Sequence, residues 1–184
     1  MQHEFLFAGF GGQGVMFVGQ LLAYAAMDAG KEVTWIPSYG PEMRGGTAHC
    51  VVVISDHVIG SPVVRSPEVV IAFNHPSFEK YESHVAEGGL LVLNASLIAA
   101  EPTRTDIDVL KIPATQIADD LGSARIANLA LLGATLAARP VLPLDAIKHA
   151  LEGHIPAHRR DMLGMNYDAL ERGAEAARVV LAPA

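Results

Sequence analysis

The chain has 184 residues, 51% of them hydrophobic and 18% charged, with a formal net charge of −7 and a single cysteine. The length favours one compact domain, and the negative charge offers no basic surface for nucleic acid or anionic lipid. One cysteine excludes an internal disulfide, a zinc knuckle or an iron–sulfur site within the chain, and it suits a cytoplasmic protein. The charged fraction is below the usual quarter or so of soluble domains, which predicts more apolar surface than one small monomer needs.

The first elements form a strand–turn–helix pattern. Residues 4–8 are an apolar strand, residues 9–14 a glycine turn, and residues 14–29 a helix that ends at Gly30. Residues 5–27 carry no charge, but the glycines inside this run and the acidic Glu4 before it argue against a signal peptide or a membrane span. A second strand over 33–36 ends at Pro37, so the pattern predicts a βαβ unit and a parallel sheet.

The β/α alternation then continues to residue 138. A loop over 37–46, PSYGPEMRGG, leads into a strand over 47–55, and its shortness allows this third strand to run antiparallel. Further strands are expected over 69–73, 90–93 and 109–112, and helices over 76–85, 113–121 and 126–138, the last apolar nearly all round. Only helices follow, over 143–151 and 161–181.

These elements predict an α/β fold with a Rossmann-like, mostly parallel or mixed sheet and helices on both faces. We expect a single domain over residues 1–184, with residues 140–184 as a helical C-terminal extension.

The glycine turn, Gly9-Phe10-Gly11-Gly12-Gln13-Gly14, satisfies G-x-G-x-x-G directly between a strand and a helix. Glycines let the backbone approach a ligand, and the free N–H groups of a helix start attract an anion such as a phosphate. Alternatively, the glycines only permit close packing of strand and helix. A dinucleotide enzyme would place an acidic residue at the end of the second strand, where this chain has Ile36-Pro37-Ser38, so the usual mode of NAD binding is disfavoured.

The loop over 37–46 is the second candidate for a ligand site, since it would share a sheet edge with the glycine turn. Arg44 could hold a phosphate or carboxylate, Glu42 could orient it, and Gly45-Gly46 allow unusual backbone shapes. A rigid surface loop that meets a protein partner through Tyr39 fits equally well. No catalytic or metal-ligating constellation is evident, and Cys50 in an apolar strand is expected to be structural.

The motifs quoted so far resemble the gamma subunit of 2-oxoacid:ferredoxin oxidoreductases. The match rests on GFGGQGV at 9–15, PSYGPEMRGGTA at 37–48 and the stretch over 51–77, and extends through ANLALLGA at 127–134 and MLGMNYDALERG at 162–173. The second loop looks more like the 2-oxoglutarate and branched-chain (ketoisovalerate) types than the pyruvate type.

The resemblance implies a cytoplasmic complex that oxidatively decarboxylates a 2-oxo acid, 2-oxoglutarate being favoured, with coenzyme A to acyl-CoA, carbon dioxide and reduced ferredoxin. It implies alpha, beta and delta-type partner subunits that carry thiamine diphosphate and the iron–sulfur clusters, while this chain is structural and could contribute to the coenzyme A site. The isolated chain would be inactive and could form a homodimer. Nucleic acid and membrane are not expected partners.

We expect no catalytic residue, no metal ligand and no firmly bound cofactor on this chain. The residues expected at a cofactor-binding site are Gly9, Gly11, Gly12, Gln13, Gly14, Ser38, Tyr39, Gly40, Glu42, Arg44, Gly45 and Gly46. Two alternatives stay open: an independent NAD- or flavin-binding oxidoreductase, and a non-enzymatic scaffold of the same fold.

Overall fold

The computed structural model describes residues 1–38, 47–155 and 157–182, apart from the side chains of residues 157–159. The strands are β1 (Gln2–Gly9), β2 (Glu32–Ser38), β3 (Ala48–Ser55), β4 (Val69–Ala72), β5 (Leu90–Asn94) and β6 (Asp108–Ile112). The helices are α1 (Val15–Asp28), α2 (His75–Tyr81), α3 (Ala114–Asp120), α4 (Ala127–Ala138), α5 (Leu144–His154) and α6 (Leu163–Leu181). Short 3-10 turns, η2 (Glu82–His84), η3 (Ala124–Ile126) and η4 (Ala157–Met162), precede or follow α2, α4 and α6.

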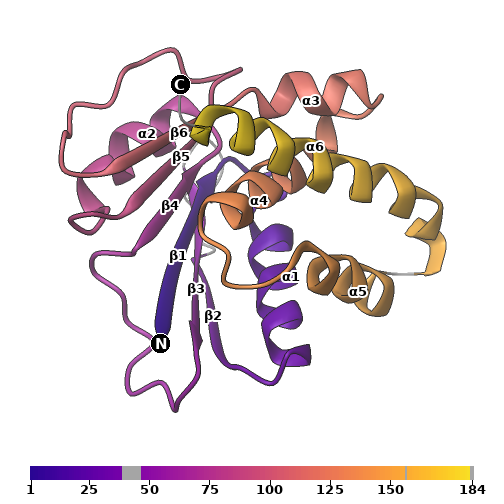
Figure 1. Ribbon diagram of the computed structural model, residues 1–184, viewed down its shortest axis with the longest axis horizontal. Helices are drawn as coiled ribbons and strands as arrows, with labels where there is room; N and C mark the ends of the chain where they lie inside the picture. The colour runs from indigo at the N-terminus through magenta and orange to yellow at the C-terminus, as the bar shows by residue number, and fades with distance from the viewer. Residues whose placement is uncertain (39–46, 156, 183–184) are drawn as a thin grey trace.

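The strands of the described chain form one six-stranded mixed sheet in the order β2-β3-β1-β4-β5-β6 (Figure 1). β1, β4, β5 and β6 are parallel neighbours, whereas β3 runs antiparallel to both β1 and β2. The expected α/β fold with a mostly parallel, mixed sheet is confirmed. The third strand reverses because the connection between Ser38 and Ala48 is too short to return through a crossover helix.

The first two strands are not neighbours, which corrects the simple βαβ unit expected from the sequence. β3 lies between β1 and β2 and pairs with both of them. Because each is antiparallel to β3, β1 and β2 point in the same direction and their carboxyl ends share one sheet edge. At this edge Gly9 pairs with Ala48, and Ser38 pairs with His49.

Helices cover both faces of the sheet, as expected, but unequally. Alternate residues of β1 face two separate cores, because successive side chains of a strand point to opposite faces. Phe5 and Phe7 enter the larger core with α1 and the helices from α3 to α6, while Leu6 and Ala8 meet Phe78 of α2 on the other side. Figure 1 shows α1, α4, α5 and α6 gathered on one side of the sheet, with α2 on the other.

Helices α4 and α6 pack closely because each places a glycine at the crossing. A Cβ atom at Gly133 would lie closer than 3.0 Å to the backbone of Leu170, and one at Gly173 equally close to the backbone of Ala130. α4 is buried on nearly all sides, as its uncharged sequence predicted. None of the helices in the described ranges is both long and apolar enough to cross a bilayer.

Some element ends differ from the sequence prediction. β2 continues through Pro37 to Ser38, since an edge strand can carry a residue that lacks an N–H donor. The helix expected over 76–85 ends at Tyr81 and tightens into η2, and the helix expected from residue 161 begins at Leu163, after η4. These shifts do not alter the topology.

Candidate functional site

The glycine turn joins the carboxyl end of β1 to the start of α1, and its backbone needs glycine at two positions. Gly12 and Gly14 have φ angles of +92° and +74°, in the left-handed region that favours glycine. Gly14 is the N-cap of α1 and its carbonyl accepts from the Val18 N–H at 3.0 Å. Within the described residues no hydrogen bond uses the N–H groups of residues 15–17, so the helix start can receive an anion.

Gln13 fixes the shape of the turn from within. Its side-chain oxygen accepts from the Phe10 N–H at 2.7 Å and from the Asn74 Nδ2 at 2.8 Å. Asn74, which is buried, also caps α2 by accepting from the Ser77 N–H at 3.0 Å. The turn is therefore tied to the loop after β4, the next parallel strand. Gln13 acts as a structural brace through its side-chain oxygen.

Gly9 and Gly14 have packing roles as well. A Cβ atom at Gly9 would lie 2.8 Å from the Gln13 Oε1 and 2.9 Å from the Phe73 Cβ, and one at Gly14 would overlap the amide nitrogen of Asn128. By contrast, a Cβ atom at Gly12 meets nothing within 4 Å, and Gly11 is exposed. The packing interpretation therefore holds for Gly9 and Gly14, while Gly11 and Gly12 leave an open approach to the helix start and their role in binding a ligand stays a prediction.

The second loop begins and ends beside this turn. Ser38, at the carboxyl end of β2, is exposed and pairs in register with His49, one residue from the pair of Gly9 with Ala48. The remaining expected site residues lie outside the described residues: Tyr39, Gly40, Glu42, Arg44, Gly45 and Gly46.

His49 and Tyr81 form a hydrogen-bonded pair on the α2 side of this edge. The His49 Nδ1 and the Tyr81 hydroxyl are 3.0 Å apart, and Lys80 lies over the Tyr81 ring. Partial burial, with a smaller contribution from the positive charge of Lys80, lowers the pKa of His49 below its ordinary value. The neutral imidazole is therefore favoured, which makes His49 a hydrogen-bonding group rather than a fixed cation at neutral pH.

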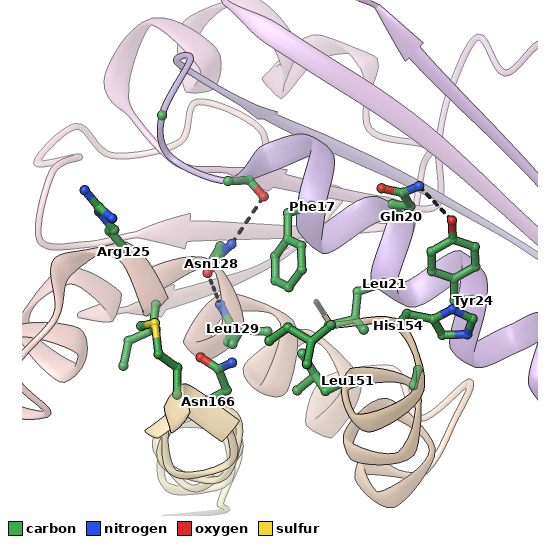
Figure 2. Close-up of a pocket in the computed structure, with 16 residues that line it drawn as sticks. Phe17, Gln20, Leu21, Tyr24, Arg125, Asn128, Leu129, Leu151, His154 and Asn166 are labelled. Carbon is green, nitrogen blue, oxygen red and sulfur yellow. Dashed lines mark hydrogen bonds between the residues drawn. The ribbon is translucent and has the colours of Figure 1, made fainter. Parts of the chain in front are cut away.

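A cavity of about 470 Å³ opens on the other side of the glycine turn, and we call it the α1 cavity (Figure 2). Gly12 and Gly14 line one end of it, and α1 forms one wall as far as Tyr24. The start of α4, the end of α5 and the start of α6 supply the other walls. Its volume is in the range of small-molecule sites.

Cys50 has no catalytic role in this arrangement. Its side chain is fully buried under α1, and its sulfur lies 3.5 Å from the Val15 carbonyl oxygen. Burial raises the pKa of the Cys50 thiol to about 12, so it stays protonated at neutral pH. Within the described ranges, no three side chains of His, Cys, Asp or Glu are grouped as metal ligands would be.

The sequence singled out the turn but not the asparagines around it. Asn74, Asn128 and Asn166 are all buried, and none was expected at a site. A signal was present: Asn128 is the one polar residue before Thr135 in the uncharged run over 126–138, and Asn74 directly follows a buried strand. A lone amide in an apolar segment must find a partner inside the fold, but the identity of that partner is a tertiary property.

Comparisons with known proteins agree over nearly the whole chain. The family model described as pyruvate ferredoxin/flavodoxin oxidoreductase matches residues 4–176. Ketoisovalerate oxidoreductase subunit VorA of Methanothermobacter thermautotrophicus is 40% identical over 172 residues, which cover 93% of this chain and 35% of the relative. The chain thus spans about a third of the length of that relative.

Two solved structures share the fold. The gamma subunit of a keto/oxoacid ferredoxin oxidoreductase from Geobacter sulfurreducens superposes with a TM-score of 0.84 at 29% identity, covering 96% of this chain and 99% of that one. A 2-oxoglutarate:ferredoxin oxidoreductase from Magnetococcus marinus, solved with 2-oxoglutarate, coenzyme A and succinyl-CoA, gives 0.87 at 25% identity, over 97% of this chain and 31% of that one. With its glycine turn, mixed sheet and matched residues, the chain belongs to the pyruvate ferredoxin/flavodoxin oxidoreductase family.

Proposed function

We propose that this chain is the gamma subunit of a cytoplasmic 2-oxoacid:ferredoxin oxidoreductase complex. The complex decarboxylates a 2-oxo acid, joins the acyl group to the sulfur of coenzyme A and releases carbon dioxide, while the electron pair passes to oxidised ferredoxin. The proposal is supported by the similarity of nearly the whole chain to a gamma subunit of that class. The solved relative that holds 2-oxoglutarate favours this substrate, whereas VorA favours the branched-chain type.

In this proposal the redox cofactors belong to the partner subunits of alpha, beta and delta type. An iron–sulfur cluster needs several thiolates, and the one cysteine of this chain is buried with its thiol held protonated. The described residues likewise gather no group of carboxylates that would hold a metal ion for thiamine diphosphate. The described residues of this chain do not fit either group.

The glycine turn is the observation that supports a ligand-binding role for this chain. Gly11 and Gly12 are exposed beside the unpaired N–H groups of the first turn of α1, and Gln13 and Asn74 hold the turn in place. Such a helix start binds the oxygen atoms of a phosphate through backbone N–H groups and the helix dipole. Coenzyme A carries phosphates of this kind, and we propose that the turn, with Arg44 from the second loop, binds one of them.

The family-level proposal is tested by purifying the native complex. We expect companion chains with cysteine-rich and thiamine-binding sequences at equal stoichiometry, and activity with 2-oxoglutarate, 2-oxoisovalerate or pyruvate only in the assembled complex. Turnover by the single chain with thiamine diphosphate, coenzyme A and an electron acceptor would contradict it. Tight binding of NADH by the isolated chain, measured by fluorescence titration, would instead support an independent dehydrogenase.

The phosphate contact is tested with two substitutions of equal size that differ in charge. Gly12→Asp and Gly12→Asn add side chains of the same shape at an open position, and both residues tolerate a positive φ better than most. Isothermal titration of the assembled complex should show coenzyme A affinity about tenfold lower for Gly12→Asp than for Gly12→Asn, because only the carboxylate repels a phosphate. Equal affinities would remove the turn from the coenzyme A site.

Arg44→Ala is the companion experiment for the second loop. We expect weaker binding of coenzyme A in the same titration, since a guanidinium bonded to a phosphate loses a charge-assisted contact. Arg178→Ala, an exposed arginine near the end of α6, is the control and should leave the affinity unchanged. Unchanged affinity in Arg44→Ala would count against this part of the proposal.

A further inference from the structure

We propose that the α1 cavity is a second binding site, which takes a small aliphatic carboxylic acid. The cavity shares Gly12 and Gly14 with the turn but extends away from the sheet edge, along α1 from Gly14 to Tyr24. This distance is roughly 15 Å at the rise of an α-helix. Figure 2 shows Phe17, Leu129 and Asn166 facing the same opening from three different helices.

The walls fit an aliphatic body. Most of the lining side chains are apolar, and two of the larger ones, Leu129 and Leu151, are each 1% exposed. The aromatic pair at the far end is already stacked, since the rings of Tyr24 and His154 lie 4.1 Å apart and nearly parallel. Their mutual contact leaves no open stacking face between them for a heteroaromatic ring. An alkyl chain needs no such face and gains from contact with aliphatic walls.

One buried amide lies at the cavity without a partner. Asn166 is 5% exposed, lines the cavity, and makes no side-chain hydrogen bond with any described residue. Asn128 beside it is hydrogen-bonded at both ends of its side-chain amide. The nitrogen donates to the Gly14 carbonyl at 3.2 Å, and the oxygen accepts from the Leu129 N–H at 2.9 Å. The amide of Asn166 is not among the enclosed polar atoms that lack a partner, so it can donate to a ligand oxygen in the cavity.

The charge of the lining selects an anion. Arg125 is exposed at the cavity and forms no ion pair with a described residue. Among the residues that the structure describes, no acidic side chain lines the cavity, although the chain has 20 Asp and Glu residues against 13 Lys and Arg. A carboxylate beside Arg125, with an alkyl chain running toward Leu151, matches both the charge and the apolar walls of the cavity.

The test uses the full chain and octanoate as the probe. Isothermal titration should show saturable binding of octanoate, with 1-octanol and AMP binding at least about tenfold more weakly, because one lacks the charge and the other the aliphatic body. Arg125→Gln should weaken octanoate binding about tenfold. Arg65→Gln, an exposed arginine in the segment between β3 and β4, is the matched control and should leave binding unchanged.

Asn166→Leu separates a binding role from a structural one. It replaces an amide at the cavity by an apolar side chain of similar size, so it should weaken octanoate binding about fivefold without lowering the urea concentration at the unfolding midpoint. A lower midpoint would mean that the amide holds the fold, and would overturn its assignment to a ligand. Absence of octanoate binding, binding unchanged in both Arg125→Gln and Asn166→Leu, or preferential binding of AMP would each overturn the proposal. Preferential binding of AMP would point to the phosphorylated adenosine of coenzyme A as the occupant instead. The other results leave the coenzyme A contact untouched, because that contact is tested at Gly12 by a charge change.

Discussion

Gly14→Ala tests whether the start of α1 is held by one specific contact with α4. The substitution has two separable costs. A φ of +74° costs an alanine about 1–2 kcal/mol relative to glycine. In addition, the new Cβ atom would lie closer than 3.0 Å to the Asn128 Nδ2, and Asn128 is 3% exposed, so it has little room to move away.

The second cost is the loss of the contacts of Asn128. Displacing its side chain breaks the 3.2 Å bond to the Gly14 carbonyl and the 2.9 Å bond from the Leu129 N–H, leaving a buried amide unpaired at about 1–3 kcal/mol. Alanine also lowers the conformational entropy of the unfolded chain, which offsets about 0.4–1 kcal/mol of the loss in the free energy of unfolding. The expected net loss in the free energy of unfolding is therefore about 2–4 kcal/mol.

Gly12→Ala is the matched control, because Gly12 has a φ of +92° and open space around it. It carries only the backbone cost, about 1 kcal/mol after the same unfolded-state correction. Urea unfolding followed by the emission of Trp35, the single tryptophan, measures all variants. In a double-mutant cycle, Asn128→Ala should recover about 1–3 kcal/mol of the Gly14→Ala loss. Equal losses at Gly12 and Gly14, or a strictly additive cycle, would refute the argument.

Three further predictions concern burial and packing. Cys50, with a thiol pKa of about 12, should react with iodoacetamide at pH 8 only at the rate of unfolding, and labelling of the native chain at the rate of a free thiol would contradict its burial. The pKa of His49 is lowered by folding, so the unfolded state binds more protons below pH 6.5 and stability should fall as pH drops through that value. The urea concentration at the unfolding midpoint should depend less on pH in His49→Gln. An unchanged dependence would contradict the assignment of this effect to His49. Gly173→Ala should cost more than about 3 kcal/mol because its Cβ atom meets a backbone carbonyl of α4, whereas Gly153→Ala, in open space on α5, should stabilise by about 0.5–1 kcal/mol in thermal unfolding. Similar effects at the two glycines would show that the α4–α6 crossing relaxes.

The candidate site was only partly predictable. The glycine motif between a strand and a helix identified the turn, because tight backbone geometry is encoded locally by glycine. The separate roles of its glycines were not predictable: Gly9 and Gly14 permit close packing, and Gly11 and Gly12 leave the helix start accessible. That difference depends on neighbours such as Asn128, which is 114 residues away along the chain.

The sequence by itself determined the order and type of the elements, since hydrophobic periodicity, glycine and proline act over a few residues. It also excluded an internal disulfide and an iron–sulfur cluster held within the chain, because both need more than one cysteine. The tertiary structure decided that β3 lies between β1 and β2, that Gln13 is bonded to Asn74, and that α1, α4, α5 and α6 leave a cavity. These features depend on pairing and packing between distant segments, which the local pattern of the chain does not specify.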